Sequence, residues 1–284
     1  MTQNLTRTHL ETPIPLPVPL AHMLDRICVR PPYFALQKLR VVGDSLQATA
    51  PTELALGLEQ APIGAAEMGR HAAILGLCAA ALAQPDSIRR YYLAQRARFT
   101  GHHVAVTADE VLFSAQLTNL DKRKAAARVG VLADGVPLGE LSVDYTVLTE
   151  NAFARLFRSR RQPGVQTSGY QAELEGLWQH SPDQSSFTVS EVPPTICAGH
   201  FENYPALPVA VLMNYLVRLG GNFVGGPYRS VYGEVVADDL CWAGKGVRFE
   251  VTCTRQENNL HHFQGVAVSE GLVKGEMTFG LEAL

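Results

Sequence analysis

The sequence predicts an α+β fold composed of two halves that repeat the same order of elements. Three observations predict this fold. Each half has one helix candidate followed by four long strand candidates, the strand candidates alternate apolar and polar residues, and the first helix candidate is apolar on every side. A period of two is typical of antiparallel strands, and a helix that is apolar all round is usually enclosed by the rest of the fold.

The first half, residues 1–149, begins with a Pro-rich segment that leads into strand candidates up to Ala50. A helix is predicted from about Gly64 to Leu82, before the Pro85-Asp86 pair that stops it. The strand candidates that follow form a predicted antiparallel meander, in which Asp134-Gly135 is the strongest hairpin signal. They span residues 91–101, 110–120, 124–135 and 137–148.

The second half, residues 170–284, repeats this order after a strand candidate at 185–192. A helix is predicted to begin at Pro208 and to end near Gly220-Gly221, because proline suits a first helical position and glycine suits a helix end. Residues 150–169 form the predicted linker, with a short helix around 152–158. The last four strand candidates span residues 228–238, 245–256, 263–271 and 272–283.

Composition excludes several classes of function. The 284-residue chain has a net charge of −3 and scattered basic residues, so we expect no nucleic-acid partner. The most apolar helix candidate, Ala72 to Ala83, is too short to span a membrane, and the N-terminus lacks the layout of a signal peptide. The five cysteines are widely spaced among apolar residues, which favours reduced core residues. We therefore expect a cytoplasmic protein.

The segment AGHFENYPALPVAVLMNYL, from Ala198 to Leu216, carries the most informative motif. Gly199-His200-Phe201 is followed by Pro205, by Pro208 and then by a helix candidate. This spacing resembles the active-site segment of the hot-dog 3-hydroxyacyl-thioester (acyl-carrier-protein) dehydratases of fatty-acid synthesis, and Met23 to Ile27 resembles their N-terminal segment. The resemblance implies a fused double hot-dog, with two antiparallel sheets that are each wrapped around a central helix and paired as a pseudo-dimer.

The resemblance also implies where the site lies. The family has a carboxylate on the helix fourteen residues after the histidine, where this sequence has Asn214. Glu67 occupies the matching position on the helix of the first half, which has no histidine that matches His200. In the related dehydratases the histidine and the acid of one site come from different hot-dog units. One composite site, with His200 and Glu67 as catalytic residues, is therefore expected at the junction of the halves.

The expected reaction removes a proton from C2 and hydroxide from C3 of a 3-hydroxyacyl thioester. Neutral His200 suits the first step, and Glu67 suits the second if its apolar setting raises its pKa and keeps it protonated. The backbone N–H of Val209, at the start of the second helix, is expected to stabilise the thioester oxygen. This chemistry needs no cofactor and no metal. The further substrate-binding residues expected here are Phe201, Pro208, Asn214, Arg70 and His71, and the expected tunnel residues are Tyr204, Met213, Phe223 and Trp242.

The expected partner is an acyl thioester of acyl-carrier protein or coenzyme A, in fatty-acid, polyketide or related lipid biosynthesis. The basic run from Arg155 to Arg161 is either a solvated linker or an anchor for such a carrier's phosphates or acidic surface. The His102-His103 and His261-His262 pairs are not expected to bind a metal, because neighbours on a strand point to opposite faces. The fused pair either acts as a monomer or forms a homodimer.

Several alternatives stay open at this stage. Glu67 equally suits an ion pair with Arg70 or His71, three and four positions along the same helix. A hot-dog thioesterase would direct water at the thioester carbonyl with a carboxylate and an amide, and Asn214 is compatible with that chemistry. A third alternative is a non-catalytic acyl-binding subunit of a synthase complex. The second half would then have lost its acid, and the first half its histidine, because neither is needed for binding. Hydration and double-bond isomerisation would use the same groups as dehydration.

Overall fold

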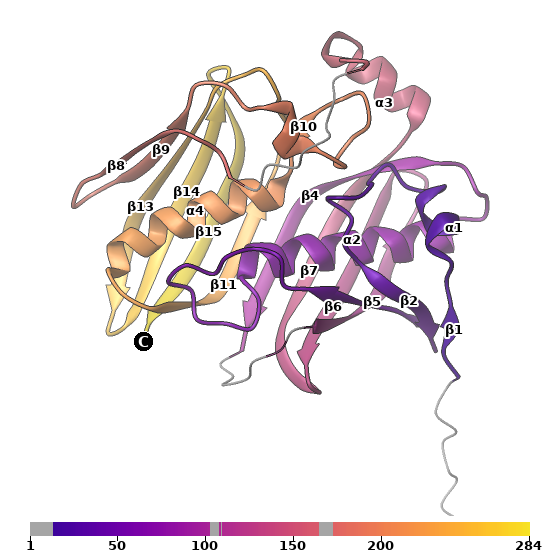
Figure 1. The fold of residues 1–284 in the computed structure, drawn as a ribbon, viewed down its shortest axis with the longest axis horizontal. Helices are drawn as coiled ribbons and strands as arrows, with labels where there is room; N and C mark the ends of the chain where they lie inside the picture. The colour runs from indigo at the N-terminus through magenta and orange to yellow at the C-terminus, as the bar shows by residue number, and fades with distance from the viewer. Residues whose placement is uncertain (1–13, 103–107, 109, 165–172) are drawn as a thin grey trace, which may run out of the picture.

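A computed structural model describes residues 14–102, 108, 110–164 and 173–284. The predicted α+β organisation is confirmed. In Figure 1 the N-terminal half, in indigo to magenta, lies beside the C-terminal half, in orange to yellow, and each half has a long helix across its strands. The first half contains β1 (Leu16–Pro17), α1 (Leu20–Leu24), β2 (Gln37–Val42), β3 (Ser45–Pro51), α2 (Ala65–Ala83), β4 (Arg90–Gly101), β5 (Glu110–Leu120), β6 (Lys124–Ala133) and β7 (Val136–Thr149).

A short connecting helix and the second half follow β7. The connection contains α3 (Glu150–Leu156) and the 3-10 helix η1 (Arg158–Arg160), close to the predicted short helix. The boundary predicted near residue 169 lies outside the described residues. The second half contains β8 (Leu177–His180), β9 (Ser185–Val189), the 3-10 helix η2 (Pro194–Cys197), β10 (Ala206–Leu207), α4 (Val209–Val224), β11 (Tyr228–Val236), β12 (Cys241–Trp242), β13 (Val247–Glu257), β14 (Leu260–Ser269) and β15 (Leu272–Ala283).

One antiparallel sheet runs through both halves. Its thirteen strands within the described residues have the order β1-β2-β3-β5-β6-β7-β4-β11-β15-β14-β13-β9-β8. The seam between the halves is the pair β4 and β11, in which Thr100 lies opposite Tyr232 and Arg96 lies opposite Val236. The backbone hydrogen bonds of this seam make the two halves one continuous structure.

The predicted hairpin between β6 and β7 is confirmed. Asp134 and Gly135 both have positive φ angles, of 48° and 81°, which suits the type I′ turns that join antiparallel strands tightly. Glycine tolerates this conformation without steric cost, and aspartate is among the few other residues that adopt it regularly. The turn therefore fixes the register in which β6 and β7 pair.

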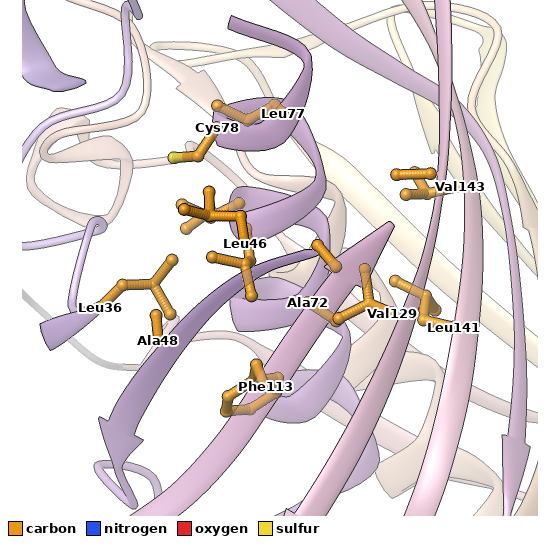
Figure 2. Packing of buried hydrophobic residues seen from close by; sticks show 14 of the residues in the cluster. Leu36, Leu46, Ala48, Ala72, Leu77, Cys78, Phe113, Val129, Leu141 and Val143 are labelled. Carbon is orange, nitrogen blue, oxygen red and sulfur yellow. The ribbon is translucent and has the colours of Figure 1, made fainter. Parts of the chain in front are cut away.

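Helix α2 is enclosed by its own half, as its apolar sequence predicts. Strands β3, β5, β6 and β7 pack against it, and Figure 2 shows Leu46, Phe113 and Val129 close to Ala72 of the helix. Phe113 and Ala72 are both fully buried. Truncation of a large buried side chain such as Phe113 to alanine costs about 3–5 kcal/mol of stability. No helix within the described residues is both long and apolar enough to cross a membrane.

The predicted bounds of α4 were partly wrong. Pro208 is the residue before the helix rather than its first residue, and the helix continues past Gly220-Gly221 to Val224. Gly225, with a φ of 70°, ends it in the left-handed conformation. Gly220 and Gly221 have a packing role instead, because a Cβ atom at either position would lie only 2.7 Å from the ring of Phe279 or Tyr228.

A buried carboxylate connects the start of α2 to the second half. Glu59 Oε1 accepts hydrogen bonds from the backbone N–H of Ala65, at 3.2 Å, and from the hydroxyl of Ser230 in β11, at 2.6 Å. On either side of Glu59, the N–H of Gln60 donates to the carbonyl oxygen of Tyr228, and the carbonyl oxygen of Leu58 accepts from the N–H of Tyr228. Burial raises the pKa of Glu59. This contact holds the start of α2 against β11 and so fixes one helix relative to the other half.

Candidate active site

A cavity of about 140 Å³ lies between α2 and α4, where the two halves meet. Helix α2 contributes Gly69, Arg70 and Ala73 to its wall, and the loop before α4 contributes His200 and Phe201. The start of α4 contributes Val209, Ala210 and Met213. The residues at its exposed end, which come from β4 and from the segment after β11, include Gln95, Arg96, Asp238 and Asp239.

His200 is held in one tautomer by a backbone carbonyl. Its Nδ1 lies 2.8 Å from the carbonyl oxygen of Ala206. A carbonyl only accepts hydrogen bonds, so Nδ1 carries the proton and Nε2 keeps a free lone pair. Tyr33 flanks the ring edge-on, at 5.2 Å between ring centroids. Burial lowers the pKa of His200 to about 4, so the ring is neutral at physiological pH and Nε2 is able to accept a proton.

The glycine of the Gly-His-Phe motif fits a contact between the halves. Gly199 has a φ of 78°, and its carbonyl oxygen accepts a hydrogen bond of 2.7 Å from the N–H of Arg30. A Cβ atom at position 199 would overlap the carbonyl oxygen of Arg30 and would lie 2.9 Å from the backbone nitrogen of Tyr33. Only glycine combines this backbone conformation with such a close approach. Gly199 therefore positions the His200 loop against the first half.

The start of α4 supplies hydrogen-bond donors to the same cavity. The backbone N–H groups of Val211 and Leu212 bond to the carbonyl oxygen of Pro208, at 2.9 and 3.2 Å. The N–H groups of Val209 and Ala210 belong to the first turn, which has no hydrogen-bond acceptor within the helix. The positive end of the helix dipole lies at the same place. Developing negative charge on a bound carbonyl oxygen would be stabilised here.

Arg70 places a permanent positive charge in the cavity wall. Its guanidinium is buried, forms an ion pair with Glu53 and lies 5.6 Å from the centre of the Tyr33 ring. Burial opposes its charge, but the hydrogen bond and charge of Glu53 outweigh this effect, and the pKa of Arg70 is raised. Arg70 was expected to contact substrate, and the structure places it with His200 in the cavity wall.

The expected role of Glu67 as a protonated acid is contradicted by its surroundings. Its carboxylate accepts hydrogen bonds from the backbone N–H groups of Glu53, at 2.8 Å, and Leu54, at 3.2 Å. Burial alone would raise its pKa, but His71 and these two N–H groups stabilise the charged form, and the pKa of Glu67 is lowered. The side chain is not among the residues that line the cavity. Glu67 is an ionised carboxylate that holds the segment after β3 against α2.

His71 and Glu67 form a buried polar group with Arg70, as the ion-pair alternative anticipated. The Nε2 atom of His71 lies 3.1 Å from a guanidinium nitrogen of Arg70 and 3.6 Å from Glu67. Burial lowers the pKa of His71, and its ring packs edge-on against Phe113 rather than in the cavity wall. Glu53, Glu67 and His71 have metal-ligand atoms within 4.8 Å of one another, but the Arg70 cation already lies against both carboxylates. The donor set therefore does not fit a metal ion.

Several other expected site residues lie away from the cavity. Pro208 and Asn214 belong to α4 or its cap but do not line the cavity, whereas Phe201, Val209 and Met213 do. Tyr204 and Trp242 pack in an aromatic cluster with Phe201 but do not line the cavity themselves, and Phe223 packs against the core of the second half. The His261-His262 pair also lies away from the cavity, and His262 bonds to the hydroxyl of Tyr232 at 2.6 Å. In the other pair, His103 lies outside the described residues.

Solved structures match this architecture, although no protein-family model and no curated protein matches the sequence. A protein of Lactobacillus plantarum, provisionally assigned as an oleoyl thioesterase, is 10% identical with a TM-score of 0.60, over 84% of this chain and 96% of that chain. The 12:0-ACP thioesterase of Umbellularia californica is 8% identical with a TM-score of 0.58, over 85% and 95%. An Alicyclobacillus acidocaldarius protein of unknown function with a hot-dog fold is 8% identical with a TM-score of 0.57, over 90% and 99%.

The chain has the hot-dog fold. At these identities the likeness shows the fold alone. The hot-dog part of the sequence prediction is confirmed, whereas membership of the dehydratase family is not. Two of the three proteins described above are named as thioesterases, which matches the alternative prediction better than the main one.

A second, polar groove has a volume of about 540 Å³. Two of its lining residues, Arg158 and Glu202, directly follow the cavity residues Phe157 and Phe201 in the chain. Three arginines, Arg89, Arg158 and Arg161, line the groove together with two carboxylates, Glu150 and Glu202. The charge of Arg89 is balanced by Glu150, at 3.5 Å, and Glu202, at 3.3 Å, whereas Arg158 and Arg161 have no ion-pair partner within the described residues. Arg160, in the same basic run, pairs with Glu270 at 2.8 Å. Within the basic run, Arg160 therefore forms an ion pair, whereas Arg158 and Arg161 line the groove.

Sequence reasoning missed Tyr33 and Glu53. Tyr33 flanks His200 and Arg70, and Glu53 forms an ion pair with the guanidinium that lines the cavity. Tyr33 and Glu53 lie in segments without regular secondary structure. The hydrophobic periods of helices and strands therefore do not indicate where these two side chains point. The only sequence signals were an aromatic residue directly after Pro31-Pro32 and an acid shortly before a helix that carries a cation.

Proposed function

We propose that this hot-dog protein hydrolyses an acyl thioester whose acyl group occupies the cavity between α2 and α4. The observation that carries this proposal is that His200 and the first two residues of α4, Val209 and Ala210, line the same cavity. Hydrolysis needs a base to activate water and donors to stabilise the carbonyl oxygen. His200 is the base, and the backbone N–H groups of Val209 and Ala210 are the donors.

In the proposed reaction, Nε2 of His200 takes a proton from water as the water oxygen attacks the thioester carbonyl carbon. The N–H groups of Val209 and Ala210 stabilise the oxyanion, and the charge of Arg70 adds to this stabilisation. The tetrahedral intermediate then collapses and its C–S bond breaks, and the proton on His200 passes to the departing sulfur. The products are a carboxylic acid and a thiol.

The surroundings of Glu67 also support hydrolysis over dehydration. An acid is required to protonate the departing hydroxyl of a 3-hydroxyacyl group, and Glu67 is ionised and bound to backbone N–H groups. The carboxylates that do line the cavity, Asp238 and Asp239, lie at its exposed end, and Asp239 pairs with Lys274 at 2.5 Å. The thioesterase names of the matching structures support the same reaction class.

Dehydration of a 3-hydroxyacyl thioester is the second candidate. The Gly199-His200-Phe201 motif with its two prolines favours it, because the same spacing occurs in the hot-dog dehydratases. The tautomer of His200 suits removal of a C2 proton equally well. A group other than Glu67 would then have to supply the proton for the hydroxyl.

We infer that the thioester is carried by acyl-carrier protein or coenzyme A. Both carriers contain a phosphate group in the arm that bears the thiol. The groove offers the guanidinium groups of Arg158 and Arg161, which have no ion-pair partner among the described residues. We also infer a fused pair of hot-dog units, residues 1–149 and 170–284, with residues 150–169 between them. The α3 and η1 segment of this connection would then form one wall of the carrier groove.

Thiol release tests the proposal directly. Purified protein would be incubated with a series of acyl-CoA and acyl-carrier-protein thioesters, and the free thiol would be measured with a chromogenic disulfide. We expect release that depends on enzyme concentration and disappears in the His200→Ala variant. Absence of thiol release from every member of the series would overturn the proposal.

A further inference from the structure

The side chain of Met213 separates two apolar spaces inside the protein. Met213 lines the cavity that contains His200, and it also lines a second, enclosed space of about 10 Å³. The walls of this space are apolar apart from Ser230 and Tyr232, and they come from both halves: Ala65, Ala66, Phe99, Val217, Ser230, Tyr232, Gly233, Met277 and Phe279. No other residue lines both spaces within the described part of the chain.

The position of the Met213 side chain is determined by α2. A Cβ atom at Gly69 would lie 3.4 Å from the terminal Cε of Met213, so the thioether extends from α4 across to α2 at the place where α2 has no side chain. Met213 is buried, with 7% of its surface exposed. A methionine side chain is unbranched and adaptable, and it fills irregular gaps between packed elements. Here it forms the part of the cavity wall that adjoins the second space.

The cavity is small for an acyl pocket. A closed apolar cavity of about 150 Å³ in another protein holds one benzene molecule, so about six carbon atoms fill a space of this size. The cavity here, of about 140 Å³, must also accept the thioester carbonyl next to His200. A longer chain would collide with Met213, because the second space, of about 10 Å³, is too small to accept the displaced thioether.

We propose that Met213 sets the length of the acyl chain that this protein accepts, and that the substrates are short acyl thioesters with no more than about six carbons. This proposal rests on the proposed hydrolysis in the same cavity. Removal of the Met213 side chain beyond Cβ joins the two spaces, and the extended cavity then admits longer chains. The adjoining space has an apolar wall suited to the terminal methylenes of such a chain.

The test compares Met213→Ala with Met277→Ala, a matched control. Met277 lines the enclosed space but not the cavity, so its truncation enlarges that space without opening the partition. The specificity constant kcat/KM would be measured for butanoyl, hexanoyl, octanoyl and decanoyl thioesters. We expect Met213→Ala to raise the ratio of octanoyl to butanoyl values by about 10-fold or more, as one or two extra methylenes in an apolar pocket allow. Met277→Ala should leave that ratio within about twofold of the parent.

Two further measurements keep the test decisive. Met213→Val retains more of the packing than Met213→Ala and should shift the ratio in the same direction by a smaller factor. Binding of non-hydrolysable alkyl-CoA thioethers, measured by calorimetry, should show the same change of chain-length preference. If no variant hydrolyses any thioester but the thioether preference shifts, the proposed reaction is wrong and the role of Met213 stands. An unchanged preference in folded Met213→Ala, or a parent protein that prefers decanoyl chains, would overturn the proposal for Met213.

Discussion

The Nδ1 atom of His200 lies 2.8 Å from the carbonyl oxygen of Ala206, six residues further along the chain at the start of β10. This single hydrogen bond determines which nitrogen carries the proton, and so it leaves Nε2 as a base. The glycine before His200 and the helix after Ala206 fix both ends of the loop against the rest of the fold. Position and tautomer of the proposed base are thus set by backbone groups rather than by a carboxylate.

Replacement of His200 should remove the base without unfolding the protein. We expect His200→Ala to lower kcat for thioester hydrolysis by about 100-fold or more, since general base catalysis contributes about 10²–10⁴-fold. His180→Ala, on exposed β8, is the matched control and should retain activity. Rates from thiol release, with circular dichroism to confirm the fold, check this prediction. Loss of activity in both variants, or in neither, would count against His200 as the base.

The activity should depend on pH through the protonation of His200. Burial lowers the pKa of this ring to about 4, so the base form is present above that pH and is lost as the pH falls through it. We expect kcat/KM to be level from about pH 5 to 8 and to decline below about pH 4.5. A pH profile in buffers of constant ionic strength measures this directly. An inflection of the pH profile near pH 6.5 would contradict this prediction, because it would indicate a catalytic histidine whose pKa is not lowered by burial.

The same ring should make stability depend on pH. The pKa of His200 is lower in the folded state, at about 4, than the 6.5 of an exposed histidine, so the unfolded chain binds the proton first. The stability that neutral His200 contributes is present above pH 6.5 and is lost as the pH falls from 6.5 towards 4. The loss amounts to about 3 kcal/mol on the scale of 1.36 kcal/mol for each unit of pKa. Urea unfolding at several pH values should show this slope in the parent protein and a smaller slope in His200→Gln.

Glu67→Gln separates a structural role from an acid-catalytic one. The amide keeps the size of the carboxylate but offers only one acceptor oxygen to the two N–H groups of Glu53 and Leu54. We expect a loss of stability of about 1–3 kcal/mol and a change of kcat/KM of less than about 10-fold. Urea denaturation and thiol-release kinetics on the same preparation provide both values. A fall in kcat of about 100-fold at unchanged stability would identify Glu67 as a catalytic residue.

The groove with Arg158 and Arg161 should recognise the carrier rather than the acyl group. Substitution of both arginines by glutamate is expected to raise KM for an acyl-CoA by about 10-fold or more, because a charge-assisted hydrogen bond contributes about 1.5–3 kcal/mol. KM for the corresponding N-acetylcysteamine thioester, which has no phosphate, should not change. Arg155→Glu is the matched control, since Arg155 is exposed and does not line the groove. Equal effects on the two substrates would argue against phosphate binding there.

The fold could be predicted from the sequence because its signals are local. The period of two in residues 91–148 and 228–283 reflects strands with one buried face, and Asp134-Gly135 specifies its turn through backbone conformation alone. The end of α4 was predicted wrongly because Gly220 and Gly221 resemble a helix stop, whereas they permit contact with Phe279 and Tyr228. Phe279 is far from Gly220 in the sequence, and no motif indicates that Tyr228 packs on Gly221. Both contacts arise from tertiary packing.

The site was predictable only where a motif fixes local geometry. Gly199, His200 and Phe201 occupy one loop, and their spacing to Pro208 already indicates a histidine near a helix start. The pKa of Glu67 is lowered by His71 and by the N–H groups of residues 53 and 54, and no periodic pattern places these N–H groups beside it. The positions of Tyr33 and Glu53 could not be predicted either, because both residues lie in loops whose paths depend on tertiary packing.

The product formed from a 3-hydroxyacyl thioester is the most direct test of the proposed reaction. Short 3-hydroxyacyl-CoA would be incubated with the protein and with His200→Ala, and the mixture would be resolved by mass spectrometry. We expect free coenzyme A and the intact 3-hydroxy acid from the parent protein, and unchanged substrate from the variant. A 2-enoyl thioester with its C–S bond intact would contradict hydrolysis and would identify the reaction as dehydration.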